Sequence, residues 1–382
     1  MYKKIMIVLF GAFMLLLPIL TIVFISPEQQ PFSENENRYL ASFPKLSLKT
    51  IEDEKFMEGF DEWISDRFIF REGWITLKNK TEQIIGKTEI NGVFIVDDKM
   101  IEVWKEYDKE LVDKNLTAMN DFASRHTDIP MFFLLAPNSQ EIYQNVLPAN
   151  AITSNQKTFI KNAYSSLTNF AGTIDAYSLL SENKDKYIYY RTDHHLTSFG
   201  SFLEYTAAGS KLGYTPFDIS AFNIEHASSS FRGTLYSKTL DSSVTPDIID
   251  YYTLTKDEPQ VSLSVLQGDG SYAQYDSLYF RDFLEKKDKY SSFTGANAPI
   301  VTIKTNLPNN DRSILIIKDS YAHSFVPFLT KNYSTVTMVD LRYLNVDFQE
   351  FISLNDYDQV LFMYNVITFS ADTSLLKLNT CK

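Results

Sequence analysis

A chain of 382 residues that is 44% hydrophobic, with 29 Phe and 23 Tyr, can bury a large core, which excludes an intrinsically disordered protein. Its length exceeds what one core usually supports and favours two domains, or one domain with a large insertion. The formal net charge of −12 and the pI near 5.0 argue against nucleic acid as a partner, because a phosphate backbone would be repelled. The single cysteine, Cys381, excludes an internal disulfide and a cysteine-based zinc framework.

The first segment of the chain is uncharged from Ile5 to Ile25 and follows Lys3 and Lys4. A run of this length spans a hydrocarbon core of roughly 30 Å, and the flanking lysines keep the N-terminus in the cytoplasm. A cleaved signal peptide is the alternative, but its apolar core is normally roughly 7–15 residues long and no small-residue cleavage site follows here. We therefore predict that residues 1–28 are a membrane anchor or signal segment. The body of the protein then lies outside the cytoplasm on a single-pass helix, or is secreted if the segment is cleaved.

Residues 29–90 form the second predicted region, a linker followed by helices. Residues 26–50 contain no convincing periodicity and are interpreted as a linker that leaves the membrane. Between Ile51 and Ile85 apolar and aromatic residues recur at helical spacing. This pattern predicts a helical pair with a turn near Asp66–Gly73.

Beyond this region, short apolar runs alternate with amphipathic helices. A short apolar run that follows an amphipathic helix is typical of a buried parallel strand. The predicted helices are 109–125, 155–170 and a stretch ending near 329, and the predicted strands are 93–96, 101–103, 131–135, 172–174, 314–317, 336–339 and 360–363. The alternation predicts an α/β fold with a mainly parallel sheet, whose two parts are residues 91–213 and 311–382.

The segment between these two parts, residues 214–310, has a different composition. Ser, Thr, Asp and Tyr dominate it, and apolar alternation is short, as in Tyr251–Thr255. We predict a β-rich insertion that lies beside the core and forms a wall of the site.

Asp193, His194 and His195 form the densest group of chemically active side chains. They precede a helix predicted over 199–212, capped by Thr197 or Ser198. A neutral imidazole acts as a general base when an acceptor holds its other nitrogen, and a carboxylate two residues away can supply that acceptor. This pattern favours an Asp193–His195 base pair. The alternative is that the two histidines only form hydrogen bonds at the junction.

A metal site is a second alternative for the same residues. Zinc needs three or four ligands, and the remaining histidines, His126, His226 and His323, show no ligand spacing. We predict no metal site and no cofactor.

Ser320 lies in a second group, where the apolar run 314–317 ends in Lys318–Tyr321 and a helix begins. The carboxyl end of a parallel strand is where α/β sheets place ligands, and a helix N-terminus stabilises an oxyanion. Ser320 is therefore a candidate nucleophile. The alternative is a plain helix cap, because Ser is a preferred residue at that position. Together the two groups supply a nucleophile, a base and an orienting carboxylate.

The segment from Thr192 to Thr197 reads Thr-Asp-His-His-Leu-Thr and resembles the Thr-Asp-His-His-Trp-Thr signature of the DHHW proteins. These are similar to the AlgX/AlgJ branch of the SGNH-like polysaccharide O-acetyltransferases. Further matching segments are Phe32–Arg38, Phe231–Ser237 and Lys318–Tyr321. Leu196 departs from the Trp of the signature but leaves the Asp and His in place.

The resemblance implies a three-layer SGNH-hydrolase-like core with a circularly permuted motif order. In that branch an Asp-x-His pair precedes the Ser, which corresponds here to Asp193, His195 and Ser320 as the catalytic residues. Asp319 resembles the Asp of the family's Gly-Asp-Ser block, with Lys318 in place of the Gly.

Four more residues join the predicted oxyanion or substrate-binding set. Asn365 follows Tyr364 in a strand that is similar to the one ending in the family's oxyanion-hole Asn. With the Ser320 N–H it would bind the tetrahedral oxyanion. His194 is included as the neighbour of the base. Arg342, after the strand at 336–339, can bind an anionic sugar or an acyl oxygen, although an ordinary surface arginine is the alternative.

The function predicted from these residues and the resemblance is an extracytoplasmic O-acetyltransferase that acts on a cell-surface or secreted polysaccharide. Its implied partners are the polysaccharide acceptor and a membrane-bound O-acyltransferase that supplies acetyl groups. One alternative is an acetyl-glycan esterase with the same three residues. Another is a non-catalytic glycan-binding or assembly protein.

Overall fold

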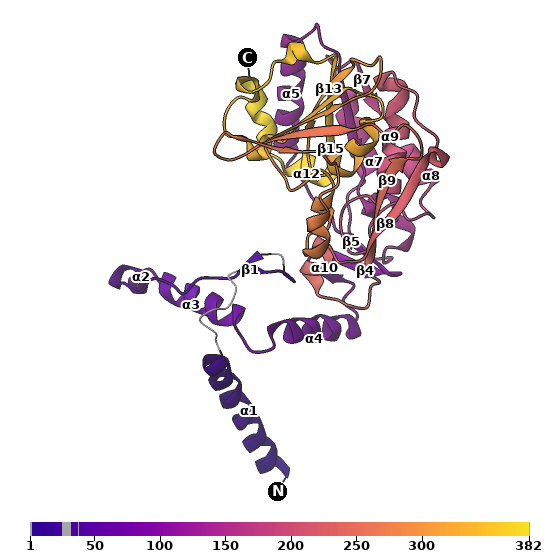
Figure 1. The fold of residues 1–382 in the computed structure, drawn as a ribbon. Helices are drawn as coiled ribbons and strands as arrows, with labels where there is room; N and C mark the ends of the chain where they lie inside the picture. Colours follow the sequence, from indigo (N-terminus) through magenta and orange to yellow (C-terminus); the bar gives the residue numbers. More distant parts are fainter. Residues whose placement is uncertain (1, 25–31, 37, 382) are drawn as a thin grey trace. The chain divides into compact units, whose positions relative to one another are not determined.

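The computed structural model describes residues 2–24, 32–36 and 38–381, and it divides into two compact units (Figure 1). One unit comprises Met1–Asn91 with Tyr236–Ser243, and the other comprises Gly92–Leu235 with Val244–Lys382. The predicted linker at 26–50 lies in part outside the described residues.

The first unit begins with α1 (Tyr2–Phe24), a helix long and apolar enough to cross a membrane. A signal sequence would satisfy the same criterion. The predicted helical pair is present as α3 and α4, and the remaining elements of this unit are short. Their bounds are β1 (Phe32–Ser33), β2 (Arg38–Tyr39), α2 (Leu48–Glu52), α3 (Lys55–Asp66), α4 (Arg71–Ile84) and β3 (Glu89–Ile90).

An eight-stranded sheet forms the centre of the second unit, in the order β11-β10-β12-β14-β13-β15-β6-β7. The five strands from β14 to β7 are parallel, whereas β12, β10 and β11 pair antiparallel. Their bounds are β6 (Met131–Ala136), β7 (Gly172–Ile174), β10 (Val261–Leu266), β11 (Tyr272–Tyr275), β12 (Ile300–Thr305), β13 (Ser313–Lys318), β14 (Thr335–Val339) and β15 (Gln359–Asn365). The predicted α/β fold with a large, mainly parallel sheet is confirmed.

Helices cover both faces of this sheet, and strand β13 shows why its central run, 314–317, is apolar. Ile314 and Ile316 belong to one hydrophobic cluster, together with residues of α8, α9 and α11. Leu315 and Ile317 belong to a second cluster, with residues of α5, α7 and α12. Successive side chains of a strand point to opposite faces, so a strand covered on both sides needs a continuous apolar run. The helices are α5 (Lys109–Arg125), α7 (Gln156–Ser165), α8 (Ala176–Glu182), α9 (Ser198–Leu212), α11 (Ala322–Leu329) and α12 (Val366–Ala371).

The hairpin of β4 (Val93–Val96) and β5 (Lys99–Glu102) differs from its prediction in one strand. The second strand begins at Lys99 because the turn has only two residues, Asp97 and Asp98, with φ of 45° and 58°. Two consecutive residues with positive φ are typical of a tight hairpin turn.

The predicted insertion is less separate from the core than expected. Its strands β8 (Phe222–Phe231) and β9 (Asp247–Leu254) form their own antiparallel pair, but β10 to β12 extend the central sheet. Strand β12 pairs with β14 and so satisfies backbone groups that an edge strand would leave open.

Glu204, on the buried side of α9, carries a carboxyl group that is enclosed without compensation. Its exposed fraction is 0%, and neither carboxyl oxygen has a hydrogen-bond partner within the described part of the chain. Burial raises the pKa of Glu204 well above its ordinary value, and the charge of Asp319 adds to the effect. The folded protein therefore holds this group in the neutral form.

We predict that Glu204→Met stabilises the protein at high pH. When folding raises the pKa of an acid, the protein loses stability as the pH rises above the pKa of that acid in the unfolded chain, 4.5. The reason is that the unfolded chain releases the proton while the folded protein still retains it. The apolar replacement should raise the free energy of unfolding by roughly 1–3 kcal/mol at pH 8 and by less at pH 4. Urea unfolding of the full chain in detergent measures this, with the exposed Glu182→Met as control. A gain that does not depend on pH would contradict the prediction.

Candidate active site

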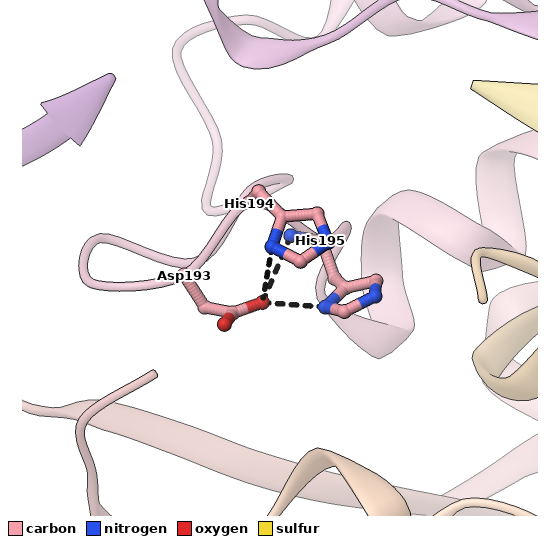
Figure 2. A group of neighbouring side chains, drawn as sticks. All are labelled: Asp193, His194 and His195. Carbon is pink, nitrogen blue, oxygen red and sulfur yellow. Dashed lines mark hydrogen bonds and ion pairs between the residues drawn. The ribbon is translucent and has the colours of Figure 1, made fainter. Parts of the chain in front are cut away.

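Asp193, His195 and Ser320 form one hydrogen-bonded chain. The Oδ1 atom of Asp193 lies 2.5 Å from Nδ1 of His195, and Nε2 of His195 lies 2.8 Å from Oγ of Ser320. His195 and Ser320 are 125 positions apart in the sequence. Figure 2 shows one oxygen of Asp193 joined by dashed lines to both neighbouring histidines. The structure thus brings together the three side chains that were predicted to act as one group.

The hydrogen bonds define which imidazole nitrogen carries the proton. A carboxylate only accepts, so Nδ1 of His195 donates and Nε2 presents its lone pair to the Ser320 hydroxyl. Burial lowers the pKa of His195 to about 4, and the neighbouring His194 lowers it further, whereas the charge of Asp193 acts in the opposite direction. Burial alone would raise the pKa of Asp193, but the two histidines and its hydrogen bonds hold it well below its ordinary value. The geometry therefore holds a neutral base next to an ionised carboxylate.

Ser320 lies between strand β13 and helix α11 and does not cap the helix. The N-cap position of α11 is Tyr321, without a side-chain hydrogen bond, whereas the Ser320 hydroxyl points to His195. Among the backbone amides of residues 319–323, that of Ser320 alone has no acceptor within the described part of the chain. A hydroxyl bound to an imidazole nitrogen, next to an amide without an acceptor, is the arrangement that a nucleophile and an oxyanion donor require.

The loop that carries Asp193 and His195 ends at helix α9. Thr197 caps this helix by accepting a hydrogen bond from the Gly200 amide, and Gly213 ends it with a φ of 74°. The predicted cap is confirmed, and it defines where the histidine loop ends and the helix begins.

Thr234 and Gly233, on the block 231–237, hold Asp193 from the other side. Both the amide and the hydroxyl of Thr234 donate to Oδ2 of Asp193, at 2.8 and 3.0 Å. A Cβ atom on Gly233 would lie 2.2 Å from that oxygen, so only glycine leaves room for the carboxylate. The resemblance included this block but assigned it no role, and the sequence offered no other signal for it.

Asp247, from strand β9, holds the start of the same loop and was missed by the sequence analysis. Its buried carboxylate accepts hydrogen bonds from the amides of Arg191 and Thr192, at 2.6 and 2.8 Å, and from the hydroxyls of Thr192 and Tyr187, both at 2.5 Å. Burial raises the pKa of Asp247, although these four donors oppose the shift. No local pattern could indicate this contact, because it joins a polar strand to a loop 55 positions away.

Asp319 and Asn365 bind each other behind Ser320. The Nδ2 group of Asn365 donates to Asp319 at 2.6 Å and to Thr368 at 2.8 Å, and the Asn365 amide also donates to Asp319. Burial raises the pKa of Asp319 to about 6. Both side-chain hydrogens of Asn365 are therefore engaged in this structure, and its role as an oxyanion donor stays a prediction.

The remaining predicted residues occupy different environments. Arg342 forms a two-pronged ion pair with Asp340 while 29% of its side chain is exposed. His194 accepts the Tyr321 hydroxyl on its backbone oxygen and contacts Thr234 through Nδ1, at 2.8 Å. Tyr364 is fully buried in the core, so its side chain does not face solvent.

Lys318, which stands where the family signature has glycine, is buried at the end of strand β13. Its Nζ atom lies 3.1 Å from Asp340 and 2.8 Å from Nε2 of His323. Burial lowers the pKa of Lys318. The charge on Asp340 is thus shared between Lys318 and Arg342, which explains how a lysine is accommodated there.

The ligand atoms of Asp193, His194 and His195 lie within 4.8 Å of one another, close enough to hold a metal ion. Asp193 already accepts four hydrogen bonds, from the amides of His195 and Thr234, the Thr234 hydroxyl and the His195 ring. A metal would have to displace the proton on Nδ1 of His195 that completes this set. The donor set therefore fits the proton-sharing arrangement better than a metal.

The family model described as DHHW protein matches residues 36–124 and 88–339. The chain belongs to the DHHW family. The resemblance seen in the Asp193–His195 signature is confirmed by this match, which also includes the 231–237 block and Ser320. No curated protein matches the sequence.

Solved structures show the same fold at low sequence identity. A DHHW family protein from Eubacterium siraeum is 22% identical with a TM-score of 0.67, and the match covers 77% of this chain and 96% of that one. Bacillus cereus PatB1 is 21% identical with a TM-score of 0.62, covering 74% of this chain and 98% of that one. The O-acetyltransferase domain of Pseudomonas putida AlgJ aligns more distantly, at 15% identity and a TM-score of 0.48, covering 76% and 99%.

We predict that Gly233→Ala lowers the reactivity of Ser320 on the order of 10²-fold without unfolding the protein. The new methyl group would displace the Asp193 carboxylate, and a shift of about 1 Å in such a group costs on the order of 10²-fold in rate. The measurement is the rate at which phenylmethanesulfonyl fluoride modifies Ser320, followed by mass spectrometry of the intact chain.

The matched control for this substitution is Gly268→Ala, because a Cβ atom there would meet nothing within 4 Å. Both variants should show the circular dichroism of the wild type. Equal reactivity of Gly233→Ala and Gly268→Ala would show that Asp193 does not need the space beside Gly233.

Proposed function

We propose that this protein is an extracytoplasmic O-acetyltransferase that modifies a cell-surface or secreted polysaccharide. The observation that carries the proposal is the unbroken contact from the Asp193 carboxylate through the His195 ring to the Ser320 hydroxyl. Membership of the DHHW family and its resemblance to the SGNH-like acetyltransferases supply the acetyl and glycan parts of the proposal.

The proposed reaction has two steps that use the same proton carrier. Ser320 Oγ attacks the acetyl carbonyl while Nε2 of His195 takes its proton, and the departing alcohol then receives that proton as the acetyl-serine forms. In the second step a sugar hydroxyl attacks the acetyl-serine and gives its proton to Nε2, which returns it to Oγ. Asp193 orients the ring and stabilises its charged form in both steps.

The oxyanion formed in each step requires hydrogen-bond donors. The amide of Ser320 is the first donor that we propose, since no described residue accepts from it. Asn365 is the second, as the family likeness implies, and this requires its Nδ2 group to leave Thr368 or Asp319. Arg342, with part of its side chain exposed, is the group proposed to meet an anionic sugar or acyl oxygen.

The setting of the reaction follows from helix α1 and from the family likeness. We propose that α1 anchors the chain, or directs its secretion, with the α/β domain outside the cytoplasm. Acetyl groups then have to cross the membrane, so a membrane-bound O-acyltransferase is the proposed donor partner. The core is proposed to be a circularly permuted SGNH-like fold, as the family resemblance implies.

An acetyl-glycan esterase is the second candidate because the same residues serve both reactions. The two differ only in whether water or a sugar hydroxyl reaches the acetyl-serine.

We predict that Ser320→Ala lowers the turnover of 4-nitrophenyl acetate by at least about 10³-fold, as removal of a nucleophile does in serine enzymes. The exposed Ser271→Ala is the control and should retain full turnover. With a panel of oligosaccharides present, mass spectrometry should detect acetylated sugar from the wild type. Release of acetate alone would identify an esterase, and turnover unchanged in Ser320→Ala would leave only a non-catalytic role.

The pH dependence of kcat/KM for 4-nitrophenyl acetate is the next prediction. The base is active when neutral, and burial lowers the pKa of His195 to about 4. Activity should therefore fall only as pH drops through about 4 and should be level across neutral pH, whereas an unperturbed histidine would titrate near 6.5.

A matched pair of variants tests the cause of this shift. His194→Gln removes a neighbouring charge that lowers the pKa of His195, so the midpoint should rise. His226→Gln, on exposed strand β8, should leave the midpoint unchanged. An acid limb at or above 6.5 in the wild type would show that the ring is not held neutral by burial.

A further inference from the structure

Tyr290 lies flat against the base although it comes from the insertion, far from the Asp193–His195 loop in sequence. Its ring centroid is 3.7 Å from that of His195, and the two planes differ by only 9°. Its hydroxyl donates to the backbone oxygen of Ser320 at 2.9 Å. One side chain therefore contacts both the proposed base and the proposed nucleophile.

The in-plane hydrogen bonds of His195 leave one motion free. They fix Nδ1 to Asp193 and Nε2 to Ser320, but the ring can still tilt about the line that joins these contacts. A tilt turns the Nε2 lone pair away from the hydroxyl. An aromatic ring stacked in parallel removes this freedom, because any tilt forces the two rings together.

Tyr290 is itself held rigidly. It belongs to a small buried cluster with Tyr190, Phe231, Ile249, Tyr251 and Phe293. Its hydroxyl also contacts Oγ of Ser324 at 3.0 Å, and Ser324 contacts Ser201 of helix α9 at 2.7 Å. Because the Tyr290 hydrogen goes to Ser320, the Ser324 hydroxyl is the donor in that contact.

We propose that Tyr290 is the positioning residue of this site: its ring sets the plane of His195, and its hydroxyl fixes the backbone of Ser320. The ring also covers one face of the imidazole and interacts favourably with the imidazolium that forms during the reaction. The inference rests on the proposed function, since it assumes that His195 acts as a base on Ser320.

Other charged or titratable groups also face His195 and are included in the test. Asp193 and His194 come from its own loop. Asp288 acts from the insertion, and His323 acts from helix α11. Substitutions at Tyr290 leave all four groups in place, so a change in the titration of His195 reports the loss of the stacked ring.

The test compares the full-length wild type in detergent with Tyr290→Phe, Tyr290→Leu and a matched control, Tyr279→Leu. Tyr279 belongs to the same insertion, stacks on Tyr251 at 4.0 Å and 16°, and donates its hydroxyl hydrogen to the backbone oxygen of Tyr252, away from the three proposed catalytic residues. The probe is 4-nitrophenyl acetate, and kcat, KM and the pH midpoint are measured for each variant.

Tyr290→Phe keeps the ring and should lose no more than about tenfold in kcat, the effect of one or two neutral hydrogen bonds. Tyr290→Leu should lose about 10²-fold in kcat with KM unchanged, because the base is misaligned. Its pH midpoint should rise toward that of an exposed histidine, since water reaches the uncovered face. Tyr279→Leu should match the wild type in all three quantities.

Two results would overturn the proposal. One is a Tyr290→Leu variant with the kcat and pH midpoint of the wild type. The other is an equal loss in Tyr290→Leu and Tyr279→Leu, which would indicate a general packing effect. If the wild type itself shows no turnover that depends on Ser320, the proposed function fails instead, so the two failures are distinguishable.

A measurement on the unaltered protein covers the case in which Tyr290→Leu does not fold. Histidine labelled with ¹³C at Cε1 gives one NMR signal for each of the five histidines, and His195→Gln identifies the relevant one. The proton on this carbon should resonate upfield of its unstructured position because of the stacked ring. A signal at the unstructured position would refute the stacking.

Discussion

The buried carboxylate of Asp193 is the constraint on which the rest of the site depends. With 2% of its surface exposed, an ionised carboxylate would be costly unless hydrogen bonds replaced its water. Four donors do so: the ring and amide of His195, and the amide and hydroxyl of Thr234. Because one donor is the His195 ring, satisfying the charge also orients the base. Stability and geometry therefore impose the same arrangement.

The insertion between the two halves of the α/β core supplies most of this arrangement. Thr234 donates hydrogen bonds to Asp193, and Gly233 leaves the space that its carboxylate occupies. Asp247 binds the start of the loop, and Tyr290 stacks on the ring of His195. The parallel strands contribute Ser320, at the end of β13. The proposed nucleophile, from the core, thus meets a proposed base whose supports come largely from the inserted segment, and the insertion is part of the candidate site rather than an addition to it.

The local elements could be predicted because their signals are local. Helix 109–125 coincides with α5, since Asp108 caps it, and strands 93–96 and 172–174 coincide with β4 and β7. The order of the strands could not be predicted, because pairing joins segments far apart in sequence. The continuation of the sheet through β12 was missed for this reason.

In the candidate site, too, the contacts between residues close in sequence were predictable and the contacts between distant residues were not. Asp193 and His195 are two positions apart, so their contact was predictable from a turn, whereas Ser320 was equally compatible with a cap and was connected to them by family likeness. Asp247 and Tyr290 gave no signal, because a polar strand and one tyrosine among 23 do not reveal their partners. Only the folded chain shows that their side chains face the loop of His195.

The engaged amide of Asn365 raises the question of whether a second oxyanion donor is energetically accessible. If the Nδ2 group of Asn365 gives up its contact with Thr368, one neutral hydrogen bond is lost, at a cost of about 1 kcal/mol. An oxyanion donor, in contrast, contributes about 2.7–4 kcal/mol in the transition state. Asp319 can keep the other hydrogen throughout, so no buried charge is left unpaired. On these magnitudes, exchange of the Thr368 contact for the oxyanion is favourable as charge develops and unfavourable in the resting site. The hydrogen bonds seen in the resting structure are therefore compatible with Asn365 as a donor that engages only in the transition state.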